Sequence, residues 1–213
     1  MGVSSDSMLV FRPAHSGDVG LAVPLIHSSG PAAFDYVFTV PGRGGAQDFL
    51  RYAFLDGAGE FGWRNHWVGE QGGQVVAVGA GYGGHTHWPF TLAAARQILG
   101  FYGIRHAGGV MARGLRVEAV IPPPSGAMHY LGHLGVAAQW RGHGIGQALI
   151  ERLMAEGRAQ GRQRMVLDVA ASNPRAEALY ARCGFAVTGE RRSALANAQG
   201  QVPDHHRMER QLD

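Results

Sequence analysis

The sequence predicts a single mixed α/β domain, and three observations support this fold class. Short apolar runs typical of strands alternate along the chain with stretches whose apolar residues recur at helical spacing. The 213 residues suit one domain with a sizeable core, and no repeat or low-complexity linker divides them. Hydrophobic residues make up 46% and charged residues 16% of the chain, which is a globular composition and excludes a disordered one.

The first third of the chain predicts one strand and two helices. The run 8–12 (MLVFR) is a short apolar strand that Pro13 closes. Residues 18–26 and 47–55 carry apolar side chains three or four positions apart, which is the spacing of a helix with one buried face. We therefore expect a strand followed by two amphipathic helices.

A hairpin and a long connecting segment are predicted for the middle of the chain. Strands at 63–69 and 74–82 flank a Gly-Gly turn, and β-branched and small residues alternate along the second strand. Residues 90–102 have helical apolar spacing, and 114–121 is expected to form a further strand. The three prolines at 122–124 cannot donate to a sheet and predict an extended surface turn.

The last third of the chain has the most regular pattern. The expected elements are a strand at 128–136, a helix at 146–160, a strand at 164–170, a helix at 174–183, and closing strands at 185–190 and 206–210. The first of these helices has charged residues opposite its apolar face. The second has Pro174 at its start and Gly184 just after its end, as helices commonly do.

Charge and cysteine usage exclude several classes of protein. All 19 basic residues are arginine, and against 16 acids they give a net charge of +3. They are scattered, whereas a nucleic-acid surface needs a dense basic stripe, so we expect no nucleic-acid partner. The single cysteine, Cys183, excludes an internal disulfide and a cysteine zinc site, and the histidine pairs lack zinc-motif spacing, so we expect no metal. Without a membrane-length apolar run or an apolar signal core at residues 1–10, we expect a cytoplasmic protein and no membrane partner.

The strongest local signal is a glycine-rich turn, QWRGHGIG at 139–146, between an expected strand and an expected helix. The alternate glycines Gly142, Gly144 and Gly146 remove side chains from one edge of the turn, so backbone N–H groups can converge on a ligand. The first turn of the following helix adds unpaired N–H donors and the positive end of the helix dipole. Such a turn suits a phosphate or a diphosphate.

Two classes of ligand compete for this turn. A dinucleotide-binding fold requires G-x-G-x-x-G and an acidic residue about 20 positions later. Gly142, Gly144 and Asp168 fit, but the third glycine position holds Gln147, and the chain beyond it is too short for a doubly wound domain. A nucleotide-binding oxidoreductase is therefore the less favoured interpretation, and coenzyme A is the other ligand class.

Two blocks of the sequence resemble the GNAT superfamily of N-acyltransferases. Residues 134–136 (LGV) followed by 141–146 (RGHGIG) look like the acetyl-CoA motif of that family, Q/R-x-x-G-x-G/A. Residues 167–185 are similar to its strand–Asn–helix–Tyr–Gly-Phe segment. The clear match covers about residues 128–190, and residues 1–213 are expected to form one such domain.

The resemblance implies a fold and a cofactor site. The fold is a bent mixed sheet of six or seven strands with flanking helices, in which two central parallel strands splay apart and leave a wedge for the pantetheine arm. The implied co-substrate is acetyl-CoA, whose diphosphate lies on the glycine turn. Asn173 is implied to contact it, although a helix cap before Pro174 explains that residue equally well. The implied binding residues are Leu134, Gly135, Val136, Arg141, Gly142, His143, Gly144, Ile145, Gly146, Gln147 and Asn173.

The implied reaction is attack of a primary amine on the acetyl thioester. The resemblance places Tyr180 at the departing thiolate. Because an unperturbed tyrosine has a pKa of about 10 and a thiol one of about 8.5, Tyr180 stays protonated at neutral pH and can donate, uphill by about 2 kcal/mol. The alternative interpretation of Tyr180 is a core residue on the apolar face of its helix.

The base that deprotonates the amine is less well defined. Asp168 occupies the position where peptide N-terminal acetyltransferases of the family carry a glutamate base, and its shorter side chain favours a bridging water. Glu118, His129, His133 and a water relay are further candidates. Strand alternation predicts one face with His129, His133 and Gly135 and an opposite face with Tyr130, Leu134 and Val136.

The acceptor and the oligomeric state stay open at this level. The acceptor is expected to be an amine of a small molecule or a peptide, such as a peptide N-terminus, a lysine, a polyamine, an aminoglycoside or a small amine. The long segment 84–126 is expected to form a wall of the acceptor site, a homodimer surface or a peripheral helix. A transferase of another acyl group and a non-catalytic acyl-CoA-binding regulator are the alternatives to an acetyltransferase.

Overall fold

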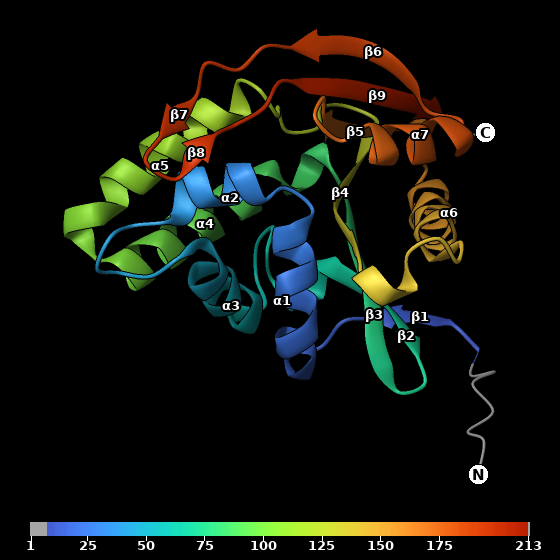
Figure 1. Cartoon of the computed structure of the whole chain (residues 1–213), viewed down its shortest axis with the longest axis horizontal. Helices are drawn as coiled ribbons and strands as arrows, with labels where there is room; N and C mark the ends of the chain where they lie inside the picture. The colour runs from blue at the N-terminus through green and yellow to red at the C-terminus, as the bar shows by residue number, and fades with distance from the viewer. Residues whose placement is uncertain (1–7, 213) are drawn as a thin grey trace.

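The computed structural model describes residues 8–212, which form a seven-stranded sheet covered by helices and a small two-stranded ribbon (Figure 1). The strands of the sheet are β1 (Val10–Pro13), β2 (His66–Gln71), β3 (Gln74–Gly83), β4 (Met128–Val136), β5 (Arg164–Ala170), β6 (Ala186–Arg191) and β9 (His205–Gln211). The ribbon consists of β7 (Ala196–Asn197) and β8 (Gly200–Gln201). The helices are α1 (Val19–Ser28), α2 (Pro31–Phe38), α3 (Ala46–Asp56), α4 (His87–Tyr102), α5 (Ile104–Glu118), α6 (Ile145–Ala159) and α7 (Pro174–Arg182).

The sheet is mixed, with one parallel pair at its centre. The strand order is β1-β2-β3-β4-β5-β9-β6, and every neighbouring pair is antiparallel except β4 and β5. Helix α6 connects β4 to β5, as a parallel pair requires a crossover. In Figure 1, α6 and α7 lie on one side of the sheet and α1 to α5 on the other. This arrangement confirms the predicted mixed sheet with flanking helices.

The two parallel strands separate soon after they begin. Pairing is limited to residues 128–130 of β4 and 164–166 of β5. Beyond Tyr130, β4 stays paired with β3 as far as Val136 but no longer pairs with β5. The gap confirms the predicted splayed central strands, and it leaves backbone groups on one edge of β4 open to a strand-like partner.

A β-bulge lies in β4 at the point where the two strands part. His133 and Leu134 together oppose a single residue of β3, Gly79. His133 has a φ of 57°, and among residues 8–212 it is the only non-glycine residue with a positive φ. A side chain in the left-handed region is strained, and such strain is concentrated at functional sites.

The bulge shows that the predicted faces of β4 were wrong. His129 packs against Gly157 of α6, whereas His133 lies on the opposite face, against Phe34 of α2. Tyr130 lies on the same face as His133. Because the bulge inserts one extra residue, side chains after it no longer follow the alternation that holds before it.

Two apolar cores pack on opposite faces of the sheet. The core under α1, α2, α3 and α5 is rich in aromatic side chains, with Phe49 and Tyr102 fully buried. The core under α6 is aliphatic and includes Leu149 and Met165.

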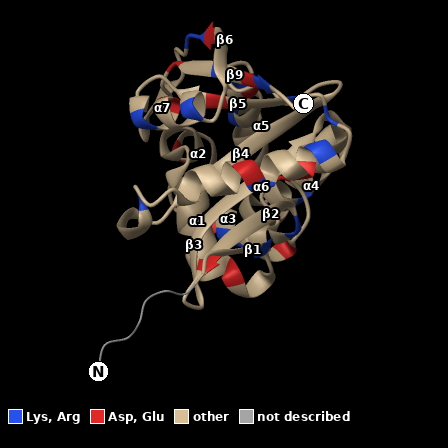
Figure 2. Ribbon diagram, turned by 90° about the vertical axis from the view of Figure 1, so that its right-hand side faces the viewer, with Lys and Arg blue, Asp and Glu red and all other residues tan. Residues whose placement is uncertain are grey.

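Acidic and basic residues are interspersed along the ribbon in Figure 2, without a continuous basic stripe in that view. Within residues 8–212, no helix combines the length and apolarity needed to cross a membrane.

The segment after β3 differs from its prediction. Residues 114–121, predicted to be a strand, form the end of α5 and the turn after it. Gly108, Gly109 and Gly114 weaken the helical pattern of α5 in the sequence, and packing against α2 and α4 stabilises the helix in their place. Segment 84–126 is thus mainly a helical hairpin of α4 and α5.

Candidate active site

The glycine turn lies at the start of α6, beside the gap between β4 and β5. Gly142 and Gly144 have φ angles of 84° and 79°, and a Cβ at either residue would meet no atom within 4 Å. Gly144 is the N-cap of α6, and it contributes no side-chain cap. The first N–H groups of α6 therefore lack a capping acceptor, and the helix dipole favours an anion in front of them.

The neighbouring side chains brace this turn without filling it. Arg141 Nε donates a 2.9 Å hydrogen bond to the carbonyl oxygen of Val136, which ties the turn to the end of β4. His143 Nδ1 lies 3.1 Å from the carbonyl oxygen of Arg141. Gln147 directs its amide along α6, and Ile145 is buried in the core. The turn keeps its shape through contacts of its own residues while its backbone donors stay accessible.

The end of β4 presents its free edge to the gap. Leu134 and Val136 contact the aliphatic core beneath α6. Gly135 faces α1, where a Cβ would lie 2.3 Å from the carbonyl oxygen of Leu25. The glycine at position 135 is therefore required by the close approach of α1, not by the approach of a cofactor that the sequence suggested.

Tyr180 lies on α7, on the same side of the sheet as α6. Its ring packs edge-on against Phe185, with 6.1 Å between the ring centroids. Burial, with a smaller contribution from Cys183, raises the pKa of Tyr180 to about 12. This pKa keeps the Tyr180 hydroxyl protonated throughout the neutral range. The hydroxyl forms no hydrogen bond with the residues that the structure describes, so it can donate to a ligand.

Asn173 is the N-cap of α7. Its side-chain oxygen accepts a 3.1 Å hydrogen bond from the backbone N–H of Ala176. This geometry is the helix cap that the sequence offered as an alternative to cofactor binding. The amide nitrogen of Asn173 stays available to a ligand beside β5.

Asp168 is buried and fully paired. Arg207 of β9 donates from Nε to Oδ1 (3.2 Å) and from Nη2 to Oδ2 (2.9 Å), and Tyr130 Oη donates to Oδ2 (3.1 Å). Arg207 Nη2 also bonds the carbonyl oxygen of Pro122 at 2.8 Å. A carboxylate with these partners joins β4, β5 and β9 across the start of the gap, and both of its oxygens already accept hydrogen bonds from the protein. The structure thus argues against the predicted base role of Asp168.

Replacing Arg207 with methionine is expected to lower the free energy of unfolding by about 3–5 kcal/mol, because it leaves a buried carboxylate without its cation. The side chains of Asp168 and Arg207 are 0% and 12% exposed. Arg164→Met is the matched control, since Arg164 pairs with Glu209 on the same two strands but is 42% exposed. We expect it to cost less than about 1 kcal/mol in urea denaturation. Equal losses in the two variants would contradict the structural role of Asp168.

A row of four contacting polar side chains lies on the opposite face of the sheet, under α1, α2 and α3. His66 Nδ1 is 2.9 Å from the carbonyl oxygen of Gly62, and His66 Nε2 is 3.0 Å from His133 Nδ1. His133 Nε2 is 3.4 Å from Glu60 Oε1, to which Tyr82 Oη donates at 2.9 Å. The sequence singled out His133 but not Glu60, His66 or Tyr82, because no local spacing connects residues from three separate segments.

Two further candidates for the base, His129 and Glu118, lie away from these four side chains. His129 is fully buried against α6, and burial, with Arg162 and His85 adding to it, lowers its pKa to about 4. Glu118 ends α5, and burial raises its pKa, as does the negative charge of Glu60. Among residues 8–212, no group of three His, Cys, Asp or Glu side chains is arranged to hold a metal.

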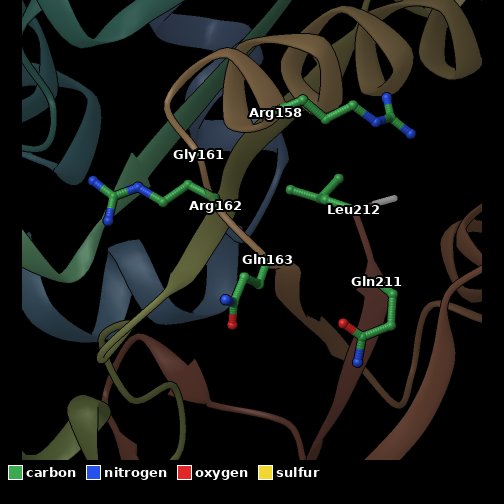
Figure 3. Close-up of a pocket in the computed structure, with 6 residues that line it drawn as sticks. All are labelled: Arg158, Gly161, Arg162, Gln163, Gln211 and Leu212. Atoms are coloured by element: carbon green, nitrogen blue, oxygen red, sulfur yellow. The ribbon is translucent and has the colours of Figure 1, made fainter.

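The surface hollows lie apart from the glycine turn. The hollow in Figure 3 has a volume of about 550 Å³ and lies between the end of α6 and the end of β9. Its lining contains Arg162 and Gln211 but none of the predicted site residues. A second hollow of about 490 Å³ lies beside the loop after β5, between Ser172 and Asp204. Neither hollow includes residues 131–136 of β4, where its pairing with β5 has ended.

A gap between parallel strands beside an uncapped helix start is the arrangement predicted from the resemblance to the GNAT superfamily of N-acyltransferases. The family comparison agrees with this class, since residues 45–185 match the model described as the Acetyltransferase (GNAT) family. The chain belongs to the GNAT acetyltransferase family.

One curated relative and several solved structures are similar to this chain. A curated relative, the 5-NmdU N-acetyltransferase of Pseudomonas phage PaMx11, is 36% identical over 103 residues, which cover 48% of this chain and 60% of that protein. The match thus spans about three fifths of the relative's length. The fold is similar to smu.2055 from Streptococcus mutans (TM-score 0.58, 18% identity, 96% of this chain and 99% of that chain). It is also similar to Salmonella typhimurium yncA with its cofactor acetyl-CoA (TM-score 0.54, 18% identity, 97% and 95%).

Proposed function

We propose that this protein transfers an acetyl group from acetyl-CoA to a primary amine, which attacks the thioester directly in a ternary complex. The observation that carries the proposal is the uncapped N-terminus of α6, placed beside the gap between β4 and β5. The presence of acetyl-CoA in the yncA structure supports the choice of co-substrate.

The chain's own backbone supplies most of the binding in this proposal. The N–H groups of residues 142–147 hold the diphosphate, and the open edge of β4 at 134–136 pairs with the amide groups of the pantetheine arm like an added strand. Arg141 and His143 hold the turn in shape, and Asn173 offers its amide nitrogen beside β5. These contacts are made mainly by main-chain groups, so their loss requires a change in backbone shape.

Tyr180 donates a hydrogen bond to the sulfur as the thiolate leaves. The pKa of about 12 for Tyr180 exceeds that of a free thiol, about 8.5, by roughly 3.5, which corresponds to about 5 kcal/mol. Complete early proton transfer is therefore disfavoured, and donation to a developing negative charge is favoured. This difference is larger than the about 2 kcal/mol expected for unperturbed groups, because Tyr180 is buried.

The acceptor is a primary amine of a small molecule or a peptide. The name of the phage relative gives 5-NmdU as that protein's acceptor, so 5-NmdU belongs in the set of amines to be tested. Transfer of another acyl group and non-catalytic binding of an acyl-CoA are the alternatives.

Calorimetry and thiol release test the proposal together. Heat on titration with acetyl-CoA but not with NADP+ supports it, and no heat with acetyl-CoA refutes it. Thiol release is then measured with 5-NmdU, a lysine peptide, a peptide with a free N-terminus, spermidine and an aminoglycoside. Binding of acetyl-CoA without thiol release from any of these amines favours the regulator.

A further inference from the structure

The hydrogen-bond partners of His66, His133, Glu60 and Tyr82 determine where the protons of these four side chains lie. The carbonyl oxygen of Gly62 can only accept, so His66 Nδ1 carries a hydrogen. Burial, with repulsion from His133, lowers the pKa of His66 to about 3, so the ring is neutral and Nε2 presents a lone pair. His133 Nδ1, 3.0 Å from that lone pair, must then donate.

His133 and Glu60 share one proton. His133 Nε2 and Glu60 Oε1 are 3.4 Å apart, and two lone pairs at this distance repel unless a proton lies between them. Tyr82 Oη donates to the same carboxylate oxygen. Burial raises the pKa of Glu60, but the interactions with His133 and Tyr82 outweigh burial and leave this pKa below its usual value. The geometry therefore places a hydrogen between His133 Nε2 and Glu60 Oε1.

We propose that Glu60 and His133 form the base that accepts the proton of the acceptor ammonium, with His66 and Tyr82 as positioning residues. The proposal rests on the proposed transferase function. His133 lies in the β4 bulge where the gap opens, on the face opposite Tyr180. Glu60 is half-buried, with a side chain 38% exposed, and is therefore more accessible than His133, whose side chain is 8% exposed. An amine approaching from this face meets Glu60 first, while the thiolate leaves on the face of Tyr180.

The proton balance of the step is complete. In the active form, the pair has lost its shared proton, and the acceptor R–NH3+ gives it one proton and becomes R–NH2. The nitrogen lone pair forms the C–N bond at the thioester carbonyl carbon, and the C–S bond breaks with its electron pair on sulfur. Tyr180 supplies the proton of the thiol and regains one from the attacking nitrogen through solvent. The pair releases its proton to solvent, so one proton is released in each turnover.

The groups around the pair are acidic or neutral. Phe34 and Phe61 cover His133 from α2 and the loop before β2. Tyr130 lies beside Tyr82, and Glu118 is near enough for its pKa to be raised by the charge of Glu60. Asp168 is neutralised by Arg207. The acidic surroundings favour a cationic amine that arrives as an ammonium ion.

Histidine NMR tests the shared proton without any acceptor. In protein labelled with 15N-histidine, His133→Asn identifies the His133 signals, and asparagine tolerates the positive φ at this position. We expect wild-type His133 to be an imidazolium with both nitrogens protonated at pH 7. Glu60→Gln should reduce that imidazolium population at least tenfold, because it removes the carboxylate partner.

Asp35→Asn is the control for this experiment. Asp35 pairs with His27 at 2.9 Å, so the substitution should change only the His27 signals. A neutral His133 in the wild type, or equal His133 spectra in wild type and Glu60→Gln, would overturn the proposal.

The pH dependence of kcat/KM tests the catalytic role, with acetyl-CoA and whichever amine of the panel releases most thiol. We expect an acidic limb in the wild type, because activity requires the deprotonated pair. Glu60→Gln and His133→Asn should lower kcat/KM at pH 7 by about 10²-fold or more and remove the limb. His66→Gln, or His66→Asn if that variant does not fold, should move the limb without removing it, and Asp35→Asn should match the wild type. If Glu60→Gln binds acetyl-CoA and acetylates the amine with an unchanged pH dependence of kcat/KM, this inference alone is overturned. If the wild type does not bind acetyl-CoA, the proposed function is overturned.

Discussion

Tyr180→Phe is expected to lower kcat by about 10²- to 10⁴-fold while the Kd for acetyl-CoA stays within about threefold. The hydroxyl has no partner among the described residues, so its removal leaves the packing of the ring on Phe185 intact. What is lost is the donor that stabilises the developing thiolate. Some activity should remain, because solvent can also protonate a thiol whose pKa is about 8.5. Steady-state thiol release and calorimetry with acetyl-CoA measure the two quantities.

The pH profile adds a second test of Tyr180. A donor fails when it loses its proton, and a pKa of about 12 keeps Tyr180 protonated to above pH 10. Between pH 7 and 10, we therefore expect no fall in kcat that is due to deprotonation of Tyr180. The pH profiles of wild type and Tyr180→Phe should have the same shape in this range. Tyr52→Phe is the control, because Tyr52 is an exposed aromatic residue of α3 that packs on Phe101. Equal kcat values in wild type and Tyr180→Phe would remove Tyr180 from the mechanism.

Gly144→Ala is expected to weaken acetyl-CoA binding by about 10- to 100-fold, because a left-handed N-cap is needed to aim the first N–H groups of α6 at one anion. An alanine there is strained by its φ of 79°, and relief of this strain turns the N–H donors away. The loss of one or two hydrogen bonds to a charged group accounts for the magnitude. Calorimetry with acetyl-CoA measures the Kd.

The other end of the same helix supplies the matched control. Gly161 follows α6 with a φ of 67°, and a Cβ there also meets no atom within 4 Å. Gly161→Ala should therefore cost a similar amount of stability, about 1–2 kcal/mol, without changing the Kd. The same Kd change in both variants would show a general effect of destabilised α6 and would contradict a diphosphate site at Gly144.

The sequence predicted the second half of the fold better than the first. The strand at 128–136 and the strand at 164–170 have the bounds observed for β4 and β5, and the helix between them begins one residue from its predicted start. Apolar spacing and glycine punctuation are local signals, and in this region they agree with the tertiary packing. In α5, the local signal was misleading because three glycines interrupt a helix that its neighbours stabilise.

The candidate site was predictable only on one face of the gap. The glycine turn and Tyr180 belong to short contiguous motifs, so the sequence located them together. Asp168 was found by position in its strand, but its pairing with Arg207 of β9, 39 positions away, was not visible in the sequence. His66 and His133, 67 positions apart, meet only because β2, β3 and β4 are adjacent in the sheet.

The sequence by itself predicted the family, the glycine turn and the place of Tyr180 on α7, because each depends on backbone freedom and residue order within a few turns of chain. Only the tertiary structure decided which carboxylate pairs with an arginine and which one lies beside His133. That choice depends on one extra residue in β4, which turns His133 toward Glu60 and away from His129. Bulges and long-range pairings follow from how strands align, and strand alignment is a property of the whole sheet.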